Sequence, residues 1–295
     1  MPNRQKHQPE VRAFLQEHLS PQDWQFSLPN GWGKESYFAQ GNGRRYFVKV
    51  GVQVERYLAM AEIGLTPPVI LHGQLESGQS IIVQSFIVGR RPSRSEYRKR
   101  LAEVAKVIRT MHNSPRMRGI LQAPPSESFL QAGLRALDRL RHKWERHRAQ
   151  VPDVAGAADD SLERLSQQVG QFSGEGLVAS HGDICNANWL FASDGRIYLI
   201  DFDLMSMDDP ALDMGAVLWW YYPPELRESF LDIAGYRYDE ECKSRMRVRM
   251  AMHCLDILLP RDGSFDKFEP DGFGESLRDF EAALEGRENP AGYGD

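Results

Sequence analysis

The residues best suited to chemistry lie in one stretch that begins at His181. Asp183 is a carboxylate in a predicted loop, where it can accept a proton from a hydroxyl group, and Asn188 follows five residues later. Asp201 comes after two short apolar runs that are rich in strand-forming residues. Amide and carboxylate oxygens are ligands for Mg²⁺, which normally completes its shell with substrate phosphates. These residue types and their spacing predict a base at Asp183 and a magnesium site at Asn188 and Asp201.

A hairpin is the element that must bring the two predicted metal ligands together. Asp194-Gly195 is a strong hairpin signal, because both residues tolerate positive φ. If they form a two-residue turn, paired residues have numbers that sum to 389, so Asn188 faces Asp201. Opposed side chains in such a ladder have Cβ atoms about 4.5–5.5 Å apart. The alternative is an ordinary hairpin with polar residues at its mouth.

The pattern H-G-D-x-x-x-x-N followed by I-D-F-D resembles the aminoglycoside phosphotransferase and choline kinase family, the small-molecule branch of the kinase-like enzymes. Gly182 stands where protein kinases carry Arg, and Asp203 stands where they carry the Gly of D-F-G. The resemblance implies an α+β, two-lobed protein-kinase-like fold. Its smaller lobe, residues 1–88, has an antiparallel β-sheet with a helix, and its larger lobe, residues 89–295, is mostly helical with an insertion at about 115–175.

The same resemblance implies a role for each residue of the motif. Asp183 orients and deprotonates the acceptor hydroxyl, while Asn188 and Asp201 hold Mg²⁺. Asp203 helps to hold a second metal ion. Support for the catalytic loop comes from two further residues, His181 and Asp213. Asp213 resembles the family's D-L-A aspartate, which braces the loop, although a helix cap is the simpler alternative.

Lys49 is the residue of the predicted smaller lobe that is suited to phosphate binding. It lies in the strand pattern F-V-K-V, where alternation places it on the same face as Phe47, and a half-covered lysine requires an anionic partner. By resemblance this lysine contacts the α- and β-phosphates of a nucleotide. We expect Glu55 to be its partner, with Glu62 as the alternative.

Two further segments are candidates for nucleotide binding. A glycine-marked loop can place backbone N–H groups over phosphates, although two glycines near a turn are also typical of a simple turn. A strand that ends at Gly89 has the position of the family's hinge, whose backbone holds the adenine. The residues in these two segments are Gly31, Gly33, Ser36, Gln84, Ser85, Phe86 and Ile87.

Acceptor contacts are expected from the larger lobe. Helical patterns cover residues 96–112, 127–150 and 161–169, with a loop predicted at 151–160 and an aromatic run from Trp219. Charged helix faces are typically solvated and aromatic runs typically pack in cores, so each candidate also has a structural interpretation. The candidates are Asp138, Trp144, Glu145, Trp219, Tyr222 and Glu225.

Composition limits the classes of protein that fit this chain of 295 residues. Its 41% hydrophobic content supports a globular core, and its net charge of −5 without a basic block argues against nucleic acid as a partner. No apolar run has the length of a membrane span, and the first residues lack a signal peptide, so we expect a cytoplasmic protein, monomeric or homodimeric. Cys185, Cys242 and Cys254 form no C-x-x-C pair, which favours reduced thiols.

These expectations combine into one predicted function. The chain is predicted to use Mg²⁺ and ATP or GTP to phosphorylate a hydroxyl of a small molecule, and its acidity favours a cationic acceptor such as an aminoglycoside-like antibiotic. Alternatives are a kinase for a metabolite such as choline, ethanolamine, thiamine or a sugar, and a catalytically silent nucleotide-binding module.

Overall fold

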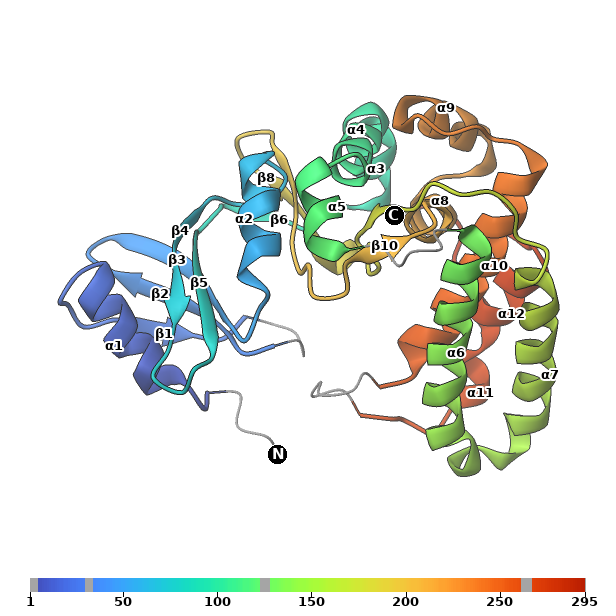
Figure 1. Ribbon diagram of the computed structural model, residues 1–295, viewed down its shortest axis with the longest axis horizontal. Helices are drawn as coiled ribbons and strands as arrows, with labels where there is room; N and C mark the ends of the chain where they lie inside the picture. Colours follow the sequence, from blue (N-terminus) through green and yellow to red (C-terminus); the bar gives the residue numbers. More distant parts are fainter. Residues whose placement is uncertain (1–4, 30–33, 123–127, 261–266, 295) are drawn as a thin grey trace. The chain divides into compact units, whose positions relative to one another are not determined.

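The computed structural model describes residues 5–29, 34–122, 128–260 and 267–294, and these divide into two compact units (Figure 1). The first unit holds the described residues of Met1–Arg90 and of Leu190–Asp203. The second holds those of Arg91–Trp189, Leu204–Arg261 and Lys267–Asp295. The hairpin that leads to Asp203 therefore groups with the N-terminal unit, while the predicted lobe boundary after residue 88 stays a prediction.

The first unit is built on an antiparallel sheet of five strands in the order β1-β2-β3-β5-β4. A smaller sheet has the order β6-β8-β9, and two helices complete the unit. The bounds are α1 Gln8–His18, β1 Gln25–Ser27, β2 Ser36–Gly41, β3 Arg44–Val50, α2 Val54–Glu62, β4 Val69–Gln74, β5 Ser80–Ser85, β6 Gly89–Arg90, β8 Trp189–Ala192 and β9 Ile197–Leu199.

The two faces of the larger sheet have different environments. Val48 and Val50 of β3 point into a buried core to which α1 contributes Val11 and Leu15. Lys49 alternates with these valines and therefore points to the opposite face. The strand period thus places the lysine on the sheet face that does not carry the α1 core.

The second unit is mostly helical, with a two-stranded antiparallel sheet of β7 and β10. Helix α10 packs against both α8 and α12, and α4 packs against α9 (Figure 1). No helix in the described ranges is long and apolar enough to cross a membrane. The bounds are α3 Arg94–Lys99, α4 Leu101–His112, α5 Pro115–Leu121, α6 Phe129–His147, η1 Arg148–Gln150, α7 Pro152–Val169, β7 Val178–Ser180, η2 Asn186–Asn188, β10 Ser206–Asp208, α8 Ala211–Tyr221, α9 Pro224–Ala234, α10 Glu240–Leu258, α11 Phe273–Ser276 and α12 Arg278–Leu284.

Two local expectations are wrong. The loop predicted at residues 151–160 is the first half of α7, because Pro152 occupies a first-turn position where its missing N–H costs nothing. The single helix predicted at 96–112 is two helices, since Arg100 leaves helical geometry at φ −110° and ψ 26°. The predicted α+β class, with an antiparallel sheet before a mostly helical part, is confirmed.

Candidate active site

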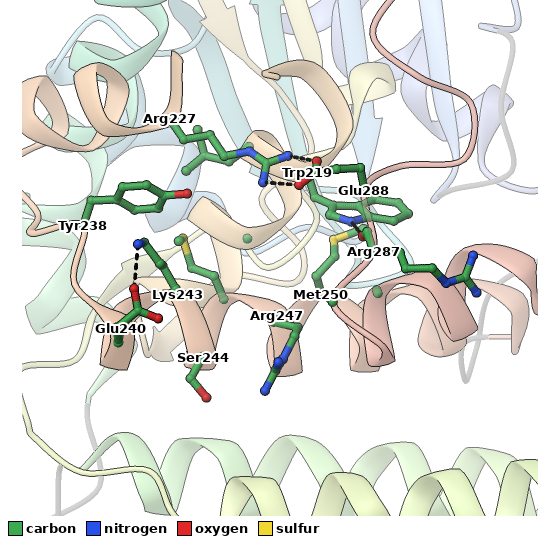
Figure 2. Close-up of a pocket in the computed structure, with 15 residues that line it drawn as sticks. Trp219, Arg227, Tyr238, Glu240, Lys243, Ser244, Arg247, Met250, Arg287 and Glu288 are labelled. Atoms are coloured by element: carbon green, nitrogen blue, oxygen red, sulfur yellow. Dashed lines mark hydrogen bonds and ion pairs between the residues drawn. The ribbon is translucent and has the colours of Figure 1, made fainter. Parts of the chain in front are cut away.

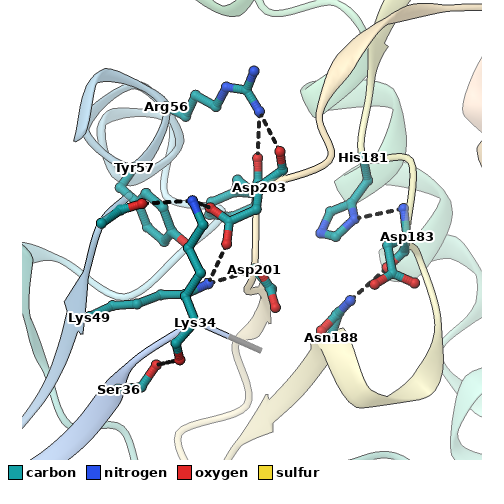
Figure 3. Close-up of polar contacts among 12 residues, drawn as sticks. Lys34, Ser36, Lys49, Arg56, Tyr57, His181, Asp183, Asn188, Asp201 and Asp203 are labelled. Carbon is teal, nitrogen blue, oxygen red and sulfur yellow. Dashed lines mark hydrogen bonds and ion pairs between the residues drawn. The ribbon is translucent and has the colours of Figure 1, made fainter. Parts of the chain in front are cut away.

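A buried lysine is the centre of the polar cluster in the first unit (Figure 3). Lys49 Nζ lies 2.7 Å from Asp201 Oδ1 and 3.1 Å from Asp203 Oδ2. It also donates to the Tyr57 hydroxyl, 3.0 Å away. A second lysine, Lys34, lies 3.3 Å from the other oxygen of Asp203. Both aspartates of the I-D-F-D motif are therefore ion-paired with the lysine of the F-V-K-V strand.

The charge state of Lys49 follows from these partners. Burial alone would lower the pKa of Lys49, but the Tyr57 hydroxyl and the carboxylates of Asp201 and Asp203 raise it well above the ordinary value. The side chain is therefore an ammonium ion throughout the physiological pH range. A cation fixed in this way is suited to neutralising phosphate oxygens.

Helix α2 contacts this cluster through Tyr57 and Arg56. The Tyr57 hydroxyl accepts a hydrogen bond from Lys49, and both Glu55 and Glu62 are exposed. Arg56 donates to the backbone carbonyls of Phe202 and Asp203, at 2.9 and 3.0 Å. The pairing of Lys49 with Glu55 stays a prediction.

Aromatic side chains occupy the lysine face of the sheet, and Phe86 is the one of them that was predicted to bind nucleotide. Phe38 is paired with Phe47 across β2 and β3, two positions along β3 from Lys49. Their rings are 5.8 Å apart, and Phe86 lies 5.6 Å from Phe38. The Arg45 guanidinium covers the rings of Phe38 and Phe86 at 4.7 and 4.1 Å. Strand alternation from Lys49 identifies Phe47, and the pairing of β2 with β3 adds Phe38.

The other two segments predicted to bind nucleotide are the glycine-marked loop and the hinge. Gly31 and Gly33 lie outside the described residues, whereas Ser36 begins β2 opposite Lys49. The Gln84 side chain is buried and donates to Pro67 O at 2.7 Å, and Gln84 is paired with both β3 and β4 in the sheet. Ser85, Phe86 and Ile87 are partly exposed at the end of β5, and their predicted role as a hinge stays a prediction.

The catalytic-loop candidates lie in the second unit (Figure 3). Asn188 ends the 3₁₀ turn η2, and its Nδ2 donates to the backbone carbonyl of Asp183 at 2.7 Å. The backbone N–H of Asp183 donates to His181 Nδ1 at 3.3 Å. All three residues are buried. Because the Asn188 amide nitrogen is used inside the loop, its oxygen is the atom left to meet a cation.

Asp213 connects this loop to the first turn of α8. Its Oδ2 accepts the backbone N–H of His181 at 2.8 Å, and its Oδ1 accepts that of Gly182 at 3.1 Å. His112, the last residue of α4, lies 2.9 Å from Oδ2 and 2.6 Å from the Tyr236 hydroxyl. One buried carboxylate therefore holds two loop amides and one imidazole. Neither His112 nor Tyr236 was among the predicted site residues.

The hairpin after Asn188 differs from the predicted one, and this corrects the register. Ala192 N donates to Arg196 O at 2.9 Å and Gly195 N donates to Ala192 O at 3.0 Å, which defines a three-residue loop with Gly195 at φ 87°. Paired numbers therefore sum to 388, so Asn188 and Asp201 are not opposed partners of one ladder. Asp201 instead lies two residues beyond β9 at φ 67°, a conformation rare for residues other than glycine.

The side-chain oxygens of the motif are of the type that binds a hard divalent cation. Asp201 and Asp203 present carboxylate oxygens in the first unit, and Asn188 presents an amide oxygen in the second. Within the described ranges, no three or more His, Cys, Asp or Glu side chains form a metal-binding group. Oxygen ligands in small number suit Mg²⁺, which completes its shell with water and phosphate.

The residues of the second unit that were predicted to contact the acceptor differ in their solvent exposure. Asp138, Glu145 and Glu225 are exposed. Trp144 and Tyr222 are buried, with their polar atoms donating to Asp159 Oδ1 at 2.7 Å and to Tyr97 O at 2.9 Å. Their burial does not fit the prediction that they contact an acceptor. Trp219 donates to Arg287 O at 3.1 Å and lines a cavity.

A family comparison decides the classification of the chain. Residues 27–250 match the profile of the phosphotransferase enzyme family. The chain belongs to this family.

Solved structures of similar proteins show a common kinase-like fold for this family member. A putative aminoglycoside phosphotransferase from Ralstonia eutropha has a TM-score of 0.69 at 16% identity, with 94% of this chain and 97% of that chain covered. Aminoglycoside phosphotransferase APH(4)-Ia, in a complex with AMP-PNP and hygromycin B, has a TM-score of 0.65 at 17% identity, with 94% and 98% covered. Choline kinase LicA from Streptococcus pneumoniae has a TM-score of 0.60 at 16% identity, with 92% and 99% covered.

Proposed function

We propose that this family member transfers the γ-phosphoryl group of ATP or GTP to a hydroxyl of a small molecule, with Mg²⁺ as cofactor. The observation that carries the proposal is the pairing of Lys49 with Asp201 and Asp203 on one face of the sheet. Kinase-like enzymes require a cation for the phosphates and carboxylates for the metal in this combination.

The lysine face of the sheet would also orient a nucleotide, with its base on the aromatic rings and its phosphates at Lys49. Phe38 and Phe47 lie two strand positions from Lys49, about 7 Å along β3. A purine base in contact with these rings directs its phosphates toward the Lys49 ammonium. Aromatic faces stack with bases without strong discrimination between them, which is compatible with either ATP or GTP.

The loop residues account for the chemical step. Asp183 accepts the proton of the acceptor hydroxyl as the acceptor oxygen bonds to the γ-phosphorus, and the bond from the γ-phosphorus to the β,γ-bridging oxygen breaks to release ADP or GDP. Asn188, Asp201 and Asp203 are the proposed magnesium ligands, and the ion would neutralise charge on the β- and γ-phosphates. Lys49 neutralises the remaining phosphate charge. Such positioning and electrostatics supply most of the rate in phosphoryl transfer.

The acceptor is proposed to be a cationic, hydroxyl-bearing compound. The net charge of −5 and the exposed carboxylates of Asp138 and Glu225 support this class. One similar structure contains hygromycin B and another is a choline kinase, so both an aminoglycoside-like antibiotic and a smaller metabolite belong to the candidates. A silent nucleotide-binding module is the weaker alternative, because the set of Lys49, Asp183, Asn188 and Asp201 is intact.

An ATP-consumption screen tests the proposal. Aminoglycosides, choline, ethanolamine, thiamine and sugars are each added to the protein with MgATP or MgGTP, and nucleoside diphosphate release is measured. We expect one class to stimulate release and Asp183→Asn to lower the stimulated rate by about 10²-fold or more, while nucleotide affinity changes little. A variant that turns over at the parent rate would show that Asp183 is not the base. A parent that binds no nucleotide would contradict the proposed function.

A further inference from the structure

We infer that the second unit carries a binding site for a small organic carboxylate, in a cavity of about 310 Å³ (Figure 2). The cavity lies between α8, α9, α10 and the segment from α12 to Glu288. Its apolar lining consists of buried side chains, namely Leu218, Met246, Met250 and Ala283, with Trp219 beside them. This volume accommodates a small ligand with an apolar body.

The cavity lies on the side of α8 that is turned away from the catalytic-loop candidates. Gly215, Leu218 and Trp219 are spaced i, i+3 and i+4, so they form one stripe on the helix. Tyr221 lies on the other side, where it stacks on Tyr97 at 4.2 Å, and the Tyr97 hydroxyl donates to Asn186 of the loop at 3.4 Å. The cavity is therefore a separate site, and the inference does not depend on the proposed function.

A close approach of two helices forms one wall of the cavity. A Cβ atom on Gly215 would lie 2.7 Å from the backbone oxygen of Met246, so α8 and α10 touch at this point through backbone atoms. Only glycine allows such an approach without displacing α10. This wall is formed by two packed helices rather than by a loop.

The charged side chains around the cavity carry a positive excess. Four cationic side chains line it, and only two acidic side chains do, Glu240 and Glu288. Glu285, which does not line the cavity, lies 2.6 Å from Arg287, so the excess is one positive charge. The four cationic residues are Arg227, Lys243, Arg247 and Arg287.

Several of these cations are held in position by neighbouring groups, as Figure 2 shows for two pairs. Arg227 forms two hydrogen bonds with the Glu288 carboxylate and a third with the Tyr293 hydroxyl. Lys243 lies 2.7 Å from Glu240 and 4.5 Å from the centre of the Tyr238 ring. Cations already fixed in this way lose little conformational entropy when an anion binds.

Two cations lie close together on α10, where Lys243 is paired with Glu240 and Arg247 is exposed. Lys243 and Arg247 are one helical turn apart, a spacing at which like charges repel each other. Within the described ranges, Arg247 forms no ion pair, and its side chain passes over Gly286, where a Cβ would lie 3.1 Å from Arg247 Cδ. Arg287 is the next residue after Gly286. A ligand carboxylate near Lys243 and Arg247 would reduce the repulsion between these two cations.

The balance of charges indicates a ligand with one negative charge. Glu240 and Glu288 offset part of the positive charge and would repel a dianion such as a phosphate monoester. The Trp219 and Tyr238 rings and the two methionines favour a flat apolar body. An aromatic carboxylate is the simplest compound that has both features.

The test is a comparison of three probes with the full chain at low salt, by ligand-observed NMR and calorimetry. Benzoate has the proposed chemistry, benzyl alcohol lacks the charge, and phenyl phosphate carries two charges. We expect benzoate to bind at least about tenfold more tightly than either of the other two, since a charge-assisted hydrogen bond contributes that much. The inference is overturned if benzoate does not bind, or if benzyl alcohol or phenyl phosphate binds equally well.

Three variants assign the binding to this cavity. The double variant Lys243→Gln and Arg247→Gln should weaken benzoate binding by about tenfold. Ser244 is exposed on the rim, so Ser244→Trp should block the cavity without disturbing the fold. Arg278→Gln on α12 is the matched control, because Arg278 does not line the cavity. Equal losses in the control, or parent-like binding by both test variants, would overturn the assignment.

Discussion

The His112 imidazole lies 2.9 Å from the Asp213 carboxylate, and both side chains are buried. This pair joins the end of α4 to the first turn of α8. The same carboxylate accepts the backbone amides of His181 and Gly182. The position of the loop that carries Asp183 therefore depends on a contact between two helices.

We predict that His112→Leu destabilises the protein and slows turnover. The substitution leaves a buried carboxylate without one of its partners, which typically costs about 3–5 kcal/mol. His112→Gln places an amide donor near the position of Nε2 and should recover part of both losses. Denaturant unfolding and the acceptor-dependent rate are the measurements. Ile108→Val, at a buried position of the same helix, is the control and should cost about 0.5–1.5 kcal/mol without slowing turnover. A turnover loss that follows stability alone in all three variants would argue against a positioning role.

Acid should destabilise the protein through Asp213. Burial alone would raise the pKa of Asp213, but the hydrogen bond and charge of His112, the charge of His181 and its backbone N–H lower it below the ordinary value. A lowered pKa in the folded state contributes stability above the unfolded value of about 3.9, and this stability is lost as pH falls through the folded value. We predict that the free energy of unfolding decreases below about pH 4 and that Asp213→Asn has a weaker decrease. Urea unfolding at several pH values measures both slopes, and equal slopes would contradict the assignment.

Glycine is required at position 182 for two reasons. Its φ is +76°, and a Cβ atom would lie 2.7 Å from the backbone oxygen of Leu204. We predict that Gly182→Ala lowers turnover and costs about 1–3 kcal/mol or more, because a positive φ is strained for alanine and the clash adds to it. Gly195→Ala has a similar φ of +87° but meets nothing within 4 Å, so it isolates the cost of the backbone conformation. Equal losses in the two variants, measured by unfolding and by rate, would show that the contact with Leu204 has no effect.

Part of the local structure around the candidate residues could be predicted because it follows short patterns. Strand alternation placed Lys49 on the same face as Phe47, and the structure places Val48 and Val50 in the core on the opposite face. The register of the hairpin could not be predicted from its turn residues alone. Gly195 adopts a positive φ in both two-residue and three-residue loops, and one added residue shifts every pair.

Contacts between distant segments were beyond the reach of local patterns. His112 and Tyr236 are separated by 124 residues, and nothing near either of them in the sequence signals their hydrogen bond. Trp144 was predicted on an acceptor-facing side, yet it is buried because α7 supplies Asp159 as a partner for its indole N–H. The sequence pattern of a helix indicates which side chains share a face, but it does not show which element packs against that face.

The last prediction concerns Asn188 and Asp201, which we propose to bind one Mg²⁺ although they are not paired in the hairpin. Each alanine variant should lose most of the Mg²⁺-dependent part of the nucleotide affinity, and the double variant should lose little more, because removal of either ligand already disrupts the ion. Asp201 also lies 2.7 Å from Lys49, so its loss changes phosphate binding without metal as well.

Nucleotide affinities are therefore measured for each variant with Mg²⁺ and with a chelator. Only the difference between these two affinities enters the double-mutant cycle. Tyr57→Phe is the control for a change at Lys49 alone, since it removes the 3.0 Å hydrogen bond to Nζ and leaves every proposed metal ligand in place. Additive losses in the Mg²⁺-dependent difference would show that the two side chains do not share an ion.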